Sequence, residues 1–387
     1  MDTVLKAADA ADFLACVPLL AGFRPHDSLA LVAFHGPRSL GVLRFDLPAE
    51  GRELDRHAAT IIGTVCKVDA ADGLAIVVYT DDPLRDADDG AAGPTPRAAL
   101  VQALIGRADA CGLGVKDALC VAADAWTSYL DPDAGVRPLQ EIEERALDPR
   151  LPGIDVDADQ SSGAFLPVVD LAAKERAARA LHDLERAVRV LSGAMRAASG
   201  VDSAPDAAAP AEPLQGIDPR ALAAACALDD VPELLEDALD WKDGLTPWEA
   251  ALLMWCLARP ALRDVALRQW CDDIDAGDAA LNAQVQWEAG EEYPVAIAQR
   301  FWGEGPRPNA ARLMAALDVV REVAALAPRE QRPGALAAAS WICWALGRST
   351  HASRFAADAL EIDPDHGLSQ IVMTMVSAGH LPDWAFE

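Results

Sequence analysis

PGALAAASWICWALGRSTHASRFAADALEIDPDH, residues 333–366, is the stretch of sequence that decides the fold. Small residues recur in it at the offsets that let two antiparallel helices pack closely, namely at Ser340, Ala352 and Ala359. Gly347 lies between them, where a turn is needed. The stretch therefore predicts a helical hairpin.

The spacing places the first helix of this hairpin over 335–346, its partner over 352–361 and a capping helix over 368–377. We expect the first helix to be sandwiched between neighbours, because it is apolar on two sides. The hairpin resembles a tetratricopeptide repeat, and that resemblance implies protein binding more than chemistry.

The rest of the chain beyond residue 216 also favours helices, and we predict no strand there. Nine of the ten tryptophans lie in this half. Each can bury a large area between helices, so we interpret them as packing residues.

The first half of the chain has a different pattern, with short apolar runs separated by helical segments. The runs at 28–35 and 39–46 flank the turn sequence HGPR and predict a hairpin. Further strands are expected over 73–80 and 117–124, with helices between the strands. Such alternation implies a mixed, partly parallel sheet, and continuous apolar runs imply helices on both of its faces. The fold class is therefore an α/β domain followed by an all-α domain.

Two segments organise the chain between these halves. Residues 127–167 lose apolar periodicity and predict a long loop, apart from a short helix near 139–146, and a long amphipathic helix follows over 169–199. Residues 200–216 are rich in Pro and Ala and predict a linker. We therefore expect an α/β domain over 1–199 and a helical domain over 217–387.

The formal net charge of −28 works against binding to nucleic acid or to an anionic membrane surface. The eight cysteines stand singly without Cys-x-x-Cys pairing, which indicates buried, reduced thiols in a cytoplasm. The apolar segment 13–23 is too short to span a bilayer and lacks the basic residues of a secretory signal.

A first candidate site is the turn that holds Arg24, His26, Asp27 and Ser28. In a catalytic interpretation, His26 acts as a base and Asp27 orients it. In a structural interpretation, these residues shape the turn and Arg24 pairs with a local carboxylate. The sequence leaves both interpretations open.

A second candidate site gathers Asp81, Asp82, Asp124 and Trp126, which follow two strands expected to be parallel. Ligands of open α/β sheets bind at that edge, and carboxylates there can hold Mg²⁺. The alternative is that these aspartates cap turns or helices. No glycine-rich phosphate loop accompanies them, so we expect no nucleotide.

The string at 155–163 has the alternating oxygen ligands of a calcium loop, but Gln160 replaces the turn glycine and Leu166 the bidentate glutamate. The histidines form no metal-binding pair. We therefore assign no metal and no cofactor.

Three segments carry a resemblance to a known family: GFRPHDSLALVAF at 22–34, VVYTDD at 77–82 and DALCVAADAWTSY at 117–129. Together with the Ala-rich helical end they resemble an actinobacterial family known only as a domain of unknown function. The resemblance spans most of the chain. It implies the same fold and an actinobacterial cytoplasm, and it implies no reaction.

These observations favour a non-enzymatic protein, in which the α/β half is a rigid platform and the helical half binds a protein partner or a second copy of the chain. The alternative is a hydrolase, or a small-ligand or metal-binding protein, that uses the α/β half. That alternative requires the 22–28 turn and the acidic strand ends to line one cleft.

Overall fold

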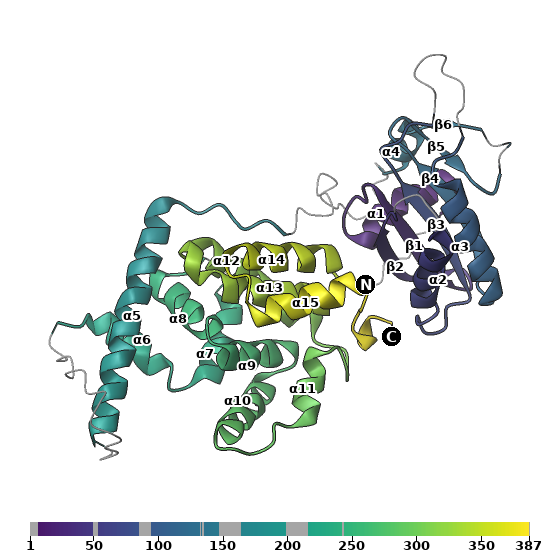
Figure 1. Cartoon of the computed structure of the whole chain (residues 1–387). Helices are drawn as coiled ribbons and strands as arrows, with labels where there is room; N and C mark the ends of the chain where they lie inside the picture. The colour runs from purple at the N-terminus through teal and green to yellow at the C-terminus, as the bar shows by residue number, and fades with distance from the viewer. Residues whose placement is uncertain are drawn as a thin grey trace. The chain divides into compact units, whose positions relative to one another are not determined.

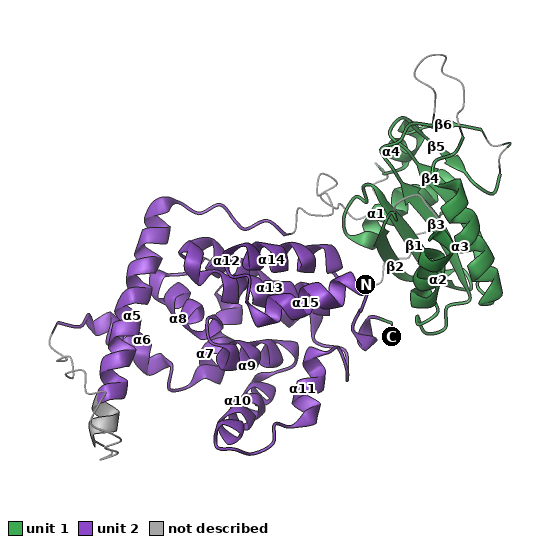
Figure 2. Cartoon of the chain, in the orientation of Figure 1, with its two compact units in different colours: residues 1–163, 386–387 green, residues 164–385 purple. Residues whose placement is uncertain are grey.

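A computed structural model of the chain describes residues 7–48, 53–84, 94–131, 133, 135–146, 164–198, 216–241 and 244–386. The chain forms two compact units (Figure 2). The α/β unit comprises residues 1–163 and 386–387, and the helical unit comprises residues 164–385. The predicted fold class, a mixed sheet with helices followed by an all-helical region, is confirmed.

Six strands form one sheet in the α/β unit, in the order β2-β1-β3-β4-β5-β6 (Figure 1). They are β1 (Ser28–His35), β2 (Arg38–Asp46), β3 (Gly73–Tyr79), β4 (Gly114–Val121), β5 (Ala125–Ser128) and β6 (Arg137–Pro138). Strand β1 pairs antiparallel with β2 and β3, whereas β3 and β4 are parallel. The predicted hairpin and the predicted parallel pairing are both present.

Helices cover both faces of the sheet because β1 and β3 are apolar on both sides. On one face, α2 (Leu54–Val65) and α3 (Ala98–Ala110) pack against side chains such as Leu31 and Ile76. On the other face, α1 (Ala10–Ala21) packs against Val32 and Val77. The central strands are therefore buried along almost their whole length.

The segment 127–167, expected to be mostly loop, contains more structure than the sequence indicates. Strand β5 extends into it, β6 lies within it, and the short helix expected near 139–146 is present as α4 (Gln140–Ala146). Strands this short carry too few residues for a visible alternation of apolar side chains. The calcium-like string at 155–163 lies outside the described residues.

The helical unit contains eleven α-helices within the described residues, whose course Figure 1 shows. They are α5 (Leu171–Ala198), α6 (Pro219–Ala227), α7 (Val231–Asp237), α8 (Pro247–Leu257), α9 (Pro260–Cys271), α10 (Ile274–Glu288), α11 (Val295–Phe301), α12 (Ala310–Leu326), α13 (Pro333–Ala345), α14 (Ser349–Ile362) and α15 (Gly367–Ser377), the first of these being the long helix expected over 169–199. Short 3₁₀ turns, η3 (Ala238–Asp240), η4 (Arg329–Gln331) and η5 (Asp383–Ala385), complete the unit.

The boundary between the units lies at 163/164, not at the predicted linker 200–216. Helix α5 belongs to the helical unit because its apolar stripe, which includes Leu181 and Leu184, packs against α6, α8 and α12. An amphipathic pattern shows that a helix has one buried face but not which neighbour covers it. Apart from Gly216, the predicted linker lies outside the described residues.

The predicted helical hairpin is present as α13 and α14, followed by α15. Every residue of α13 is buried, as expected for a helix between neighbours. Ser340 Oγ donates a hydrogen bond of 2.7 Å to the carbonyl oxygen of Ala352, which ties the two helices at a small-residue contact. Gly347 adopts a positive φ of 75° at the turn, a conformation that favours glycine.

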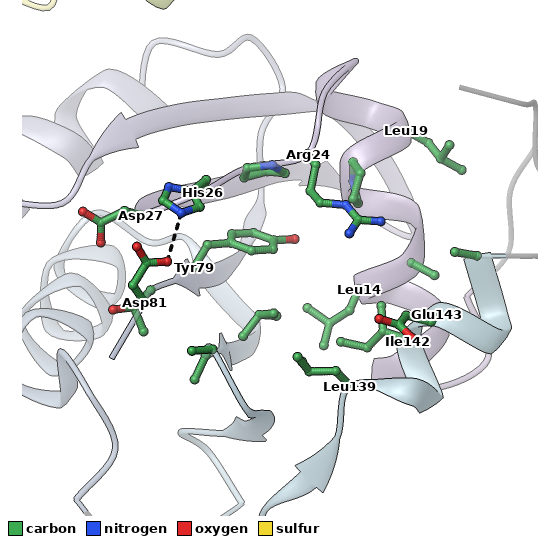
Figure 3. A pocket seen from close by; sticks show the side chains of 18 residues that line it. Leu14, Leu19, Arg24, His26, Asp27, Tyr79, Asp81, Leu139, Ile142 and Glu143 are labelled. Carbon is green, nitrogen blue, oxygen red and sulfur yellow. Dashed lines mark ion pairs between the residues drawn. The ribbon is translucent and has the colours of Figure 1, made fainter. Parts of the chain in front are cut away.

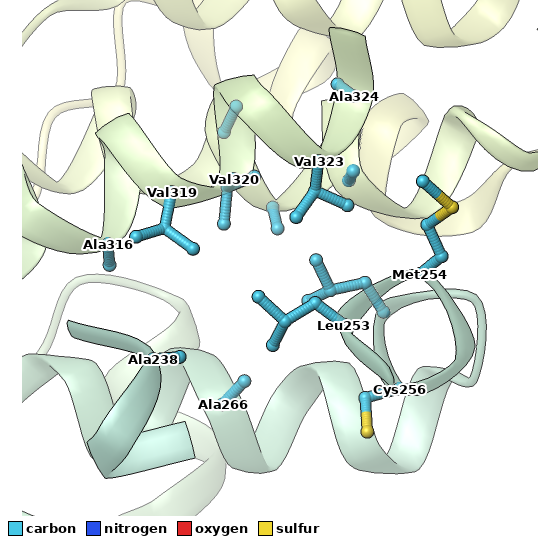
Figure 4. Close-up of a cluster of buried hydrophobic side chains, with 14 of the residues drawn as sticks. Ala238, Leu253, Met254, Cys256, Ala266, Ala316, Val319, Val320, Val323 and Ala324 are labelled. Carbon is cyan, nitrogen blue, oxygen red and sulfur yellow. The ribbon is translucent and has the colours of Figure 1, made fainter. Parts of the chain in front are cut away.

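The core of the helical unit joins elements that are far apart in the sequence. Figure 4 shows Val319, Val320 and Val323 of α12 directed toward Leu253 of α8 and Ala266 of α9. Such contacts bury β-branched and small side chains at close range. The helices therefore form one continuous core.

The cysteines and tryptophans follow the sequence expectations in part. All eight cysteines are free thiols; five are buried, whereas Cys66, Cys111 and Cys226 are exposed. Most tryptophans of the helical unit are buried or half-buried, but Trp287 and Trp302 are exposed. Within the described residues, no helix is both long enough and apolar enough to cross a membrane.

A polar contact joins three helices of the helical unit. Arg312 of α12 donates through both terminal nitrogens to the two carboxylate oxygens of Glu236 on α7, at 2.6 Å each. Gln269 of α9 donates to the same carboxylate at 2.9 Å. The hydrogen bonds from Arg312 hold the pKa of Glu236 below its ordinary value.

Replacing Gly334 by Ala should lower the free energy of unfolding by about 1–3 kcal/mol. A Cβ at this position would lie 2.2 Å from the carbonyl oxygen of Leu257, where α13 crosses α8. Urea denaturation followed by tryptophan fluorescence measures the change. The control is Gly193→Ala in α5, where a Cβ meets nothing within 4 Å and a gain of about 0.5–1 kcal/mol is expected. If Gly334→Ala had the same free energy of unfolding as the wild type, the close crossing of α13 and α8 would be contradicted.

Replacing Glu236 by Gln should lower the free energy of unfolding at pH 7 by about 1–3 kcal/mol. Because the carboxyl pKa is depressed in the folded protein, its contribution is complete above the ordinary value of 4.5 and is lost as the pH falls through the folded value. The gap between wild type and variant should therefore close below pH 4.5 in denaturation series at stepped pH. The control is Glu233→Gln, at an exposed position on the same helix. If the difference in the free energy of unfolding between wild type and Glu236→Gln did not change with pH, the stabilising role of the ionised Glu236 carboxylate would be contradicted.

Candidate functional site

A pocket of about 320 Å³ opens in the α/β unit where three kinds of element meet (Figure 3). Helices α1 and α4 form one side, the ends of β3 and β4 form the floor, and the turn 24–27 closes the remaining side. The pocket therefore lies at the carboxyl ends of the two parallel strands, the edge at which open α/β sheets bind ligands.

The wall of the pocket formed by the two helices is apolar. It presents Leu14 and Leu19 from α1, Ile142 from α4, and Leu139, which directly precedes α4. Helix α4 is held on α1 by Arg145, whose guanidinium lies 2.9 Å from an Asp12 oxygen and 3.3 Å from an Asp9 oxygen. These ion pairs keep the apolar side chains of α4 facing α1.

The opposite end of the pocket is polar and is built from the turn after α1. Gly22 ends α1 in the left-handed conformation, with φ of 78°, and redirects the chain. His26 Nε2 then lies 3.0 Å from Asp81 Oδ1, so the turn is tied to the residues after β3. Asp27 has a positive φ of 37°, an unfavourable conformation for a residue with a Cβ, with a cost of about 1–3 kcal/mol.

Tyr79, the last residue of β3, brings a buried hydroxyl into this pocket. Its side chain is 7% exposed, and its hydroxyl makes no hydrogen bond to any described residue. Figure 3 shows the hydroxyl directed toward the side of the pocket that Arg24 and Leu14 line. Burial raises the pKa of Tyr79, although the charge of Arg24 opposes this effect, so the phenol is protonated at neutral pH. An unused buried donor costs about 1–3 kcal/mol.

The structure brings together four of the eight residues proposed from the sequence. Arg24, His26, Asp27 and Asp81 line the pocket. The sequence suggested Asp27 as the carboxylate that orients His26, and the carboxylate that lies against His26 Nε2 is that of Asp81.

The other four proposed residues do not line the pocket. Asp82 accepts a hydrogen bond from Thr80 Oγ1 at 3.3 Å, and Asp124 accepts one from the backbone N–H of Leu84 at 2.7 Å, so both shape turns. Asp124 lies between β4 and β5, because β4 ends three residues earlier than expected. Ser28 is fully buried without a hydrogen bond to a described residue.

Trp126 lies inside β5, not at the sheet edge. It is 2% exposed, and the guanidinium of Arg137 lies 4.5 Å from the centre of its ring. Its ring is packed inside the α/β unit and does not line this pocket. In the described part of the chain, no group of three or more His, Cys, Asp or Glu side chains has the arrangement of a metal site.

The sequence interpretation missed Tyr79 and the wall from α4. A signal for Tyr79 was present, because its hydroxyl interrupts an otherwise apolar run, GLAIVV, directly before the acidic strand end. No comparable signal existed for Ile142 and Glu143, since α4 is short and its position on α1 depends on long-range ion pairs.

Comparisons with known proteins give a family and no function. No curated protein and no solved structure matches this chain. The family model described as "Domain of unknown function (DUF4192)" matches residues 11–383, nearly the whole sequence. The chain is thus a member of the DUF4192 family.

Proposed function

We propose that this protein binds a small organic ligand in the pocket of the α/β unit. The observation that carries the proposal is the hydroxyl of Tyr79, which is buried, lines the pocket and lacks a partner among the described residues. Native proteins pair almost all buried polar groups, so an unpaired one in a pocket favours a ligand that supplies the missing acceptor.

The size and lining of the pocket support the same proposal. A volume of about 320 Å³ is within the range of small-molecule sites. Such sites combine a mostly apolar wall with a few polar groups that orient the ligand. Here Leu14 and Ile142 belong to the wall, and Arg24, His26 and Tyr79 are among the polar groups.

Binding is a better account of the site than hydrolysis. A serine hydrolase needs its nucleophile within hydrogen-bond reach of a base. Ser28 Oγ is buried without such a bond, and His26 is oriented by Asp81 on an exposed surface. We therefore propose a non-enzymatic, ligand-binding role for the α/β unit.

Filling the pocket should abolish ligand binding. Ala123→Trp places a large side chain at an exposed lining position, and Ala110→Trp makes the same change at an exposed position of α3 outside the pocket. Each purified protein is incubated with a metabolite extract of its native host, and native mass spectrometry identifies what is bound. A small molecule should be retained by wild type and Ala110→Trp and reduced at least tenfold in Ala123→Trp. Equal retention by all three proteins, or by none, would contradict the proposal.

A second candidate function, protein binding, concerns the helical unit. Four large apolar side chains between residues 285 and 302 are more than half exposed: Val285, Trp287, Val295 and Trp302. Large exposed aromatic residues are typical of protein interfaces. We propose that α10, α11 and the residues just after them contact a protein partner or a second copy of the chain.

Charging this surface should abolish association. The double variant Trp287→Glu, Trp302→Glu is compared with Ile371→Glu, which changes an exposed apolar residue on α15. Sedimentation velocity reports self-association, and quantitative affinity purification from the native host reports partners. The double variant should lose, by tenfold or more, a complex that Ile371→Glu keeps. Identical complexes in both variants would refute the role of this surface.

We further propose that the hairpin α13–α14 packs as a tetratricopeptide repeat, which its contact between Ser340 and Ala352 supports. An actinobacterial cytoplasm is proposed as its location. The resemblance at residues 22–34 supports the source, and eight free thiols suit a reducing compartment.

A further inference from the structure

Arg24 brings a positive charge to the lining of the pocket. Arg24 is exposed, and its guanidinium forms no ion pair and no hydrogen bond with any described residue. This is so although acidic residues outnumber basic ones in the chain, 61 to 33. Arginine stays protonated at every physiological pH, so this site offers a permanent positive charge with several N–H donors.

The charge of Arg24 acts on the same part of the pocket as the hydroxyl of Tyr79, since it opposes the rise in the Tyr79 pKa. One end of the pocket thus offers a buried, unpaired hydroxyl and an exposed positive charge. The group that satisfies both is an oxyanion, and a planar carboxylate suits the fork of a guanidinium.

The rest of the lining restricts the ligand further. Asp27, Asp81 and Glu143 also line the pocket and repel every negative charge on a ligand, so a single negative charge placed at Arg24 is repelled less than a dianion such as a phosphate monoester. A cation placed at this end would be repelled by Arg24 and would leave the Tyr79 hydroxyl without an acceptor. The apolar side chains of Leu14, Leu139 and Ile142 exclude a fully polar ligand.

On the basis of the proposed pocket, we infer that its ligand is a monocarboxylate with an apolar body. The carboxylate accepts hydrogen bonds from Arg24 and Tyr79, and the hydrocarbon part lies against the side chains of α1 and α4. Arg24 and Tyr79 are then the residues that select for the head group.

The test uses three probes of equal chain length on the full-length protein: octanoate, octan-1-ol and octylammonium. Isothermal titration calorimetry at pH 7 should show octanoate binding at least tenfold more tightly than the other two probes. Hexanoate should bind more weakly than octanoate, by about fourfold for each missing methylene. Arg24→Gln should weaken octanoate binding at least tenfold, whereas Arg107→Gln, an exposed arginine of α3, should leave it unchanged.

A pair of tyrosine variants separates binding from folding. Tyr79→Phe removes a hydroxyl with no partner, so Tm should stay the same or rise while octanoate affinity falls about tenfold. Tyr129→Phe removes a hydroxyl that donates 2.6 Å to the carbonyl oxygen of Pro96, so Tm should fall while affinity is kept. A purely structural role for Tyr79 would give the opposite result.

The outcomes distinguish this inference from the pocket proposal. If octan-1-ol or octylammonium binds as tightly as octanoate, and Ala123→Trp abolishes that binding, the pocket stands and the carboxylate inference fails. If no probe binds, or if octanoate binds equally to Arg24→Gln and Tyr79→Phe, the inference also fails. The pocket proposal is then decided by the metabolite experiment alone.

Discussion

Elements that are apolar on every side must be covered on every side, and this constraint organises both units of the chain. In the α/β unit, β1 and β3 are buried on both faces, which requires α1 on one face and α2 with α3 on the other. In the helical unit, the wholly buried α13 requires neighbours around its whole circumference. The pocket is a by-product of the first requirement, because α1 must end near the strand ends and the chain must turn there to enter β1.

The pocket combines features that a purely structural cavity does not need. In a purely structural cavity, one more hydrophobic side chain could fill the space against the apolar wall. Instead it holds a buried phenol and a guanidinium without protein partners in the described part of the chain, beside a histidine fixed by Asp81. The unpaired buried hydroxyl of Tyr79 lowers stability in the empty protein. Its retention beside the exposed charge of Arg24 is therefore consistent with a role in binding and has no evident role in folding.

The sequence predicted those parts of the fold that follow from local periodicity. Continuous apolar runs located β1 and β3, and the spacing of small residues around Gly347 located the hairpin of α13 and α14, because both patterns are fixed by backbone geometry. It misplaced the unit boundary, since the stripe on α5 does not say which neighbour will cover it. It also placed β4 three residues too late, and that shift moved Asp124 from a strand end into a turn.

For the site, the sequence identified the side chains that are unusual in their own segment. The turn with Arg24 and His26 stood out because polar groups gather there, and the structure brings it to Asp81. The role of Tyr79 was hidden because a tyrosine in a buried strand normally finds a hydrogen-bond partner, and the absence of one emerges only in three dimensions. The contribution of α4 was equally hidden.

The attachment of α4 to α1 makes the pocket wall responsive to its solution environment. Arg145 and its two aspartate partners are partly exposed, so dissolved salt screens their attraction. The hydrocarbon contact between the same helices responds in the opposite direction to strongly hydrated anions such as sulfate, which strengthen it. Because the two responses oppose each other on one seven-residue helix, the strength with which α4 is held on α1 should depend on which ions surround the protein, and not only on how much salt is present.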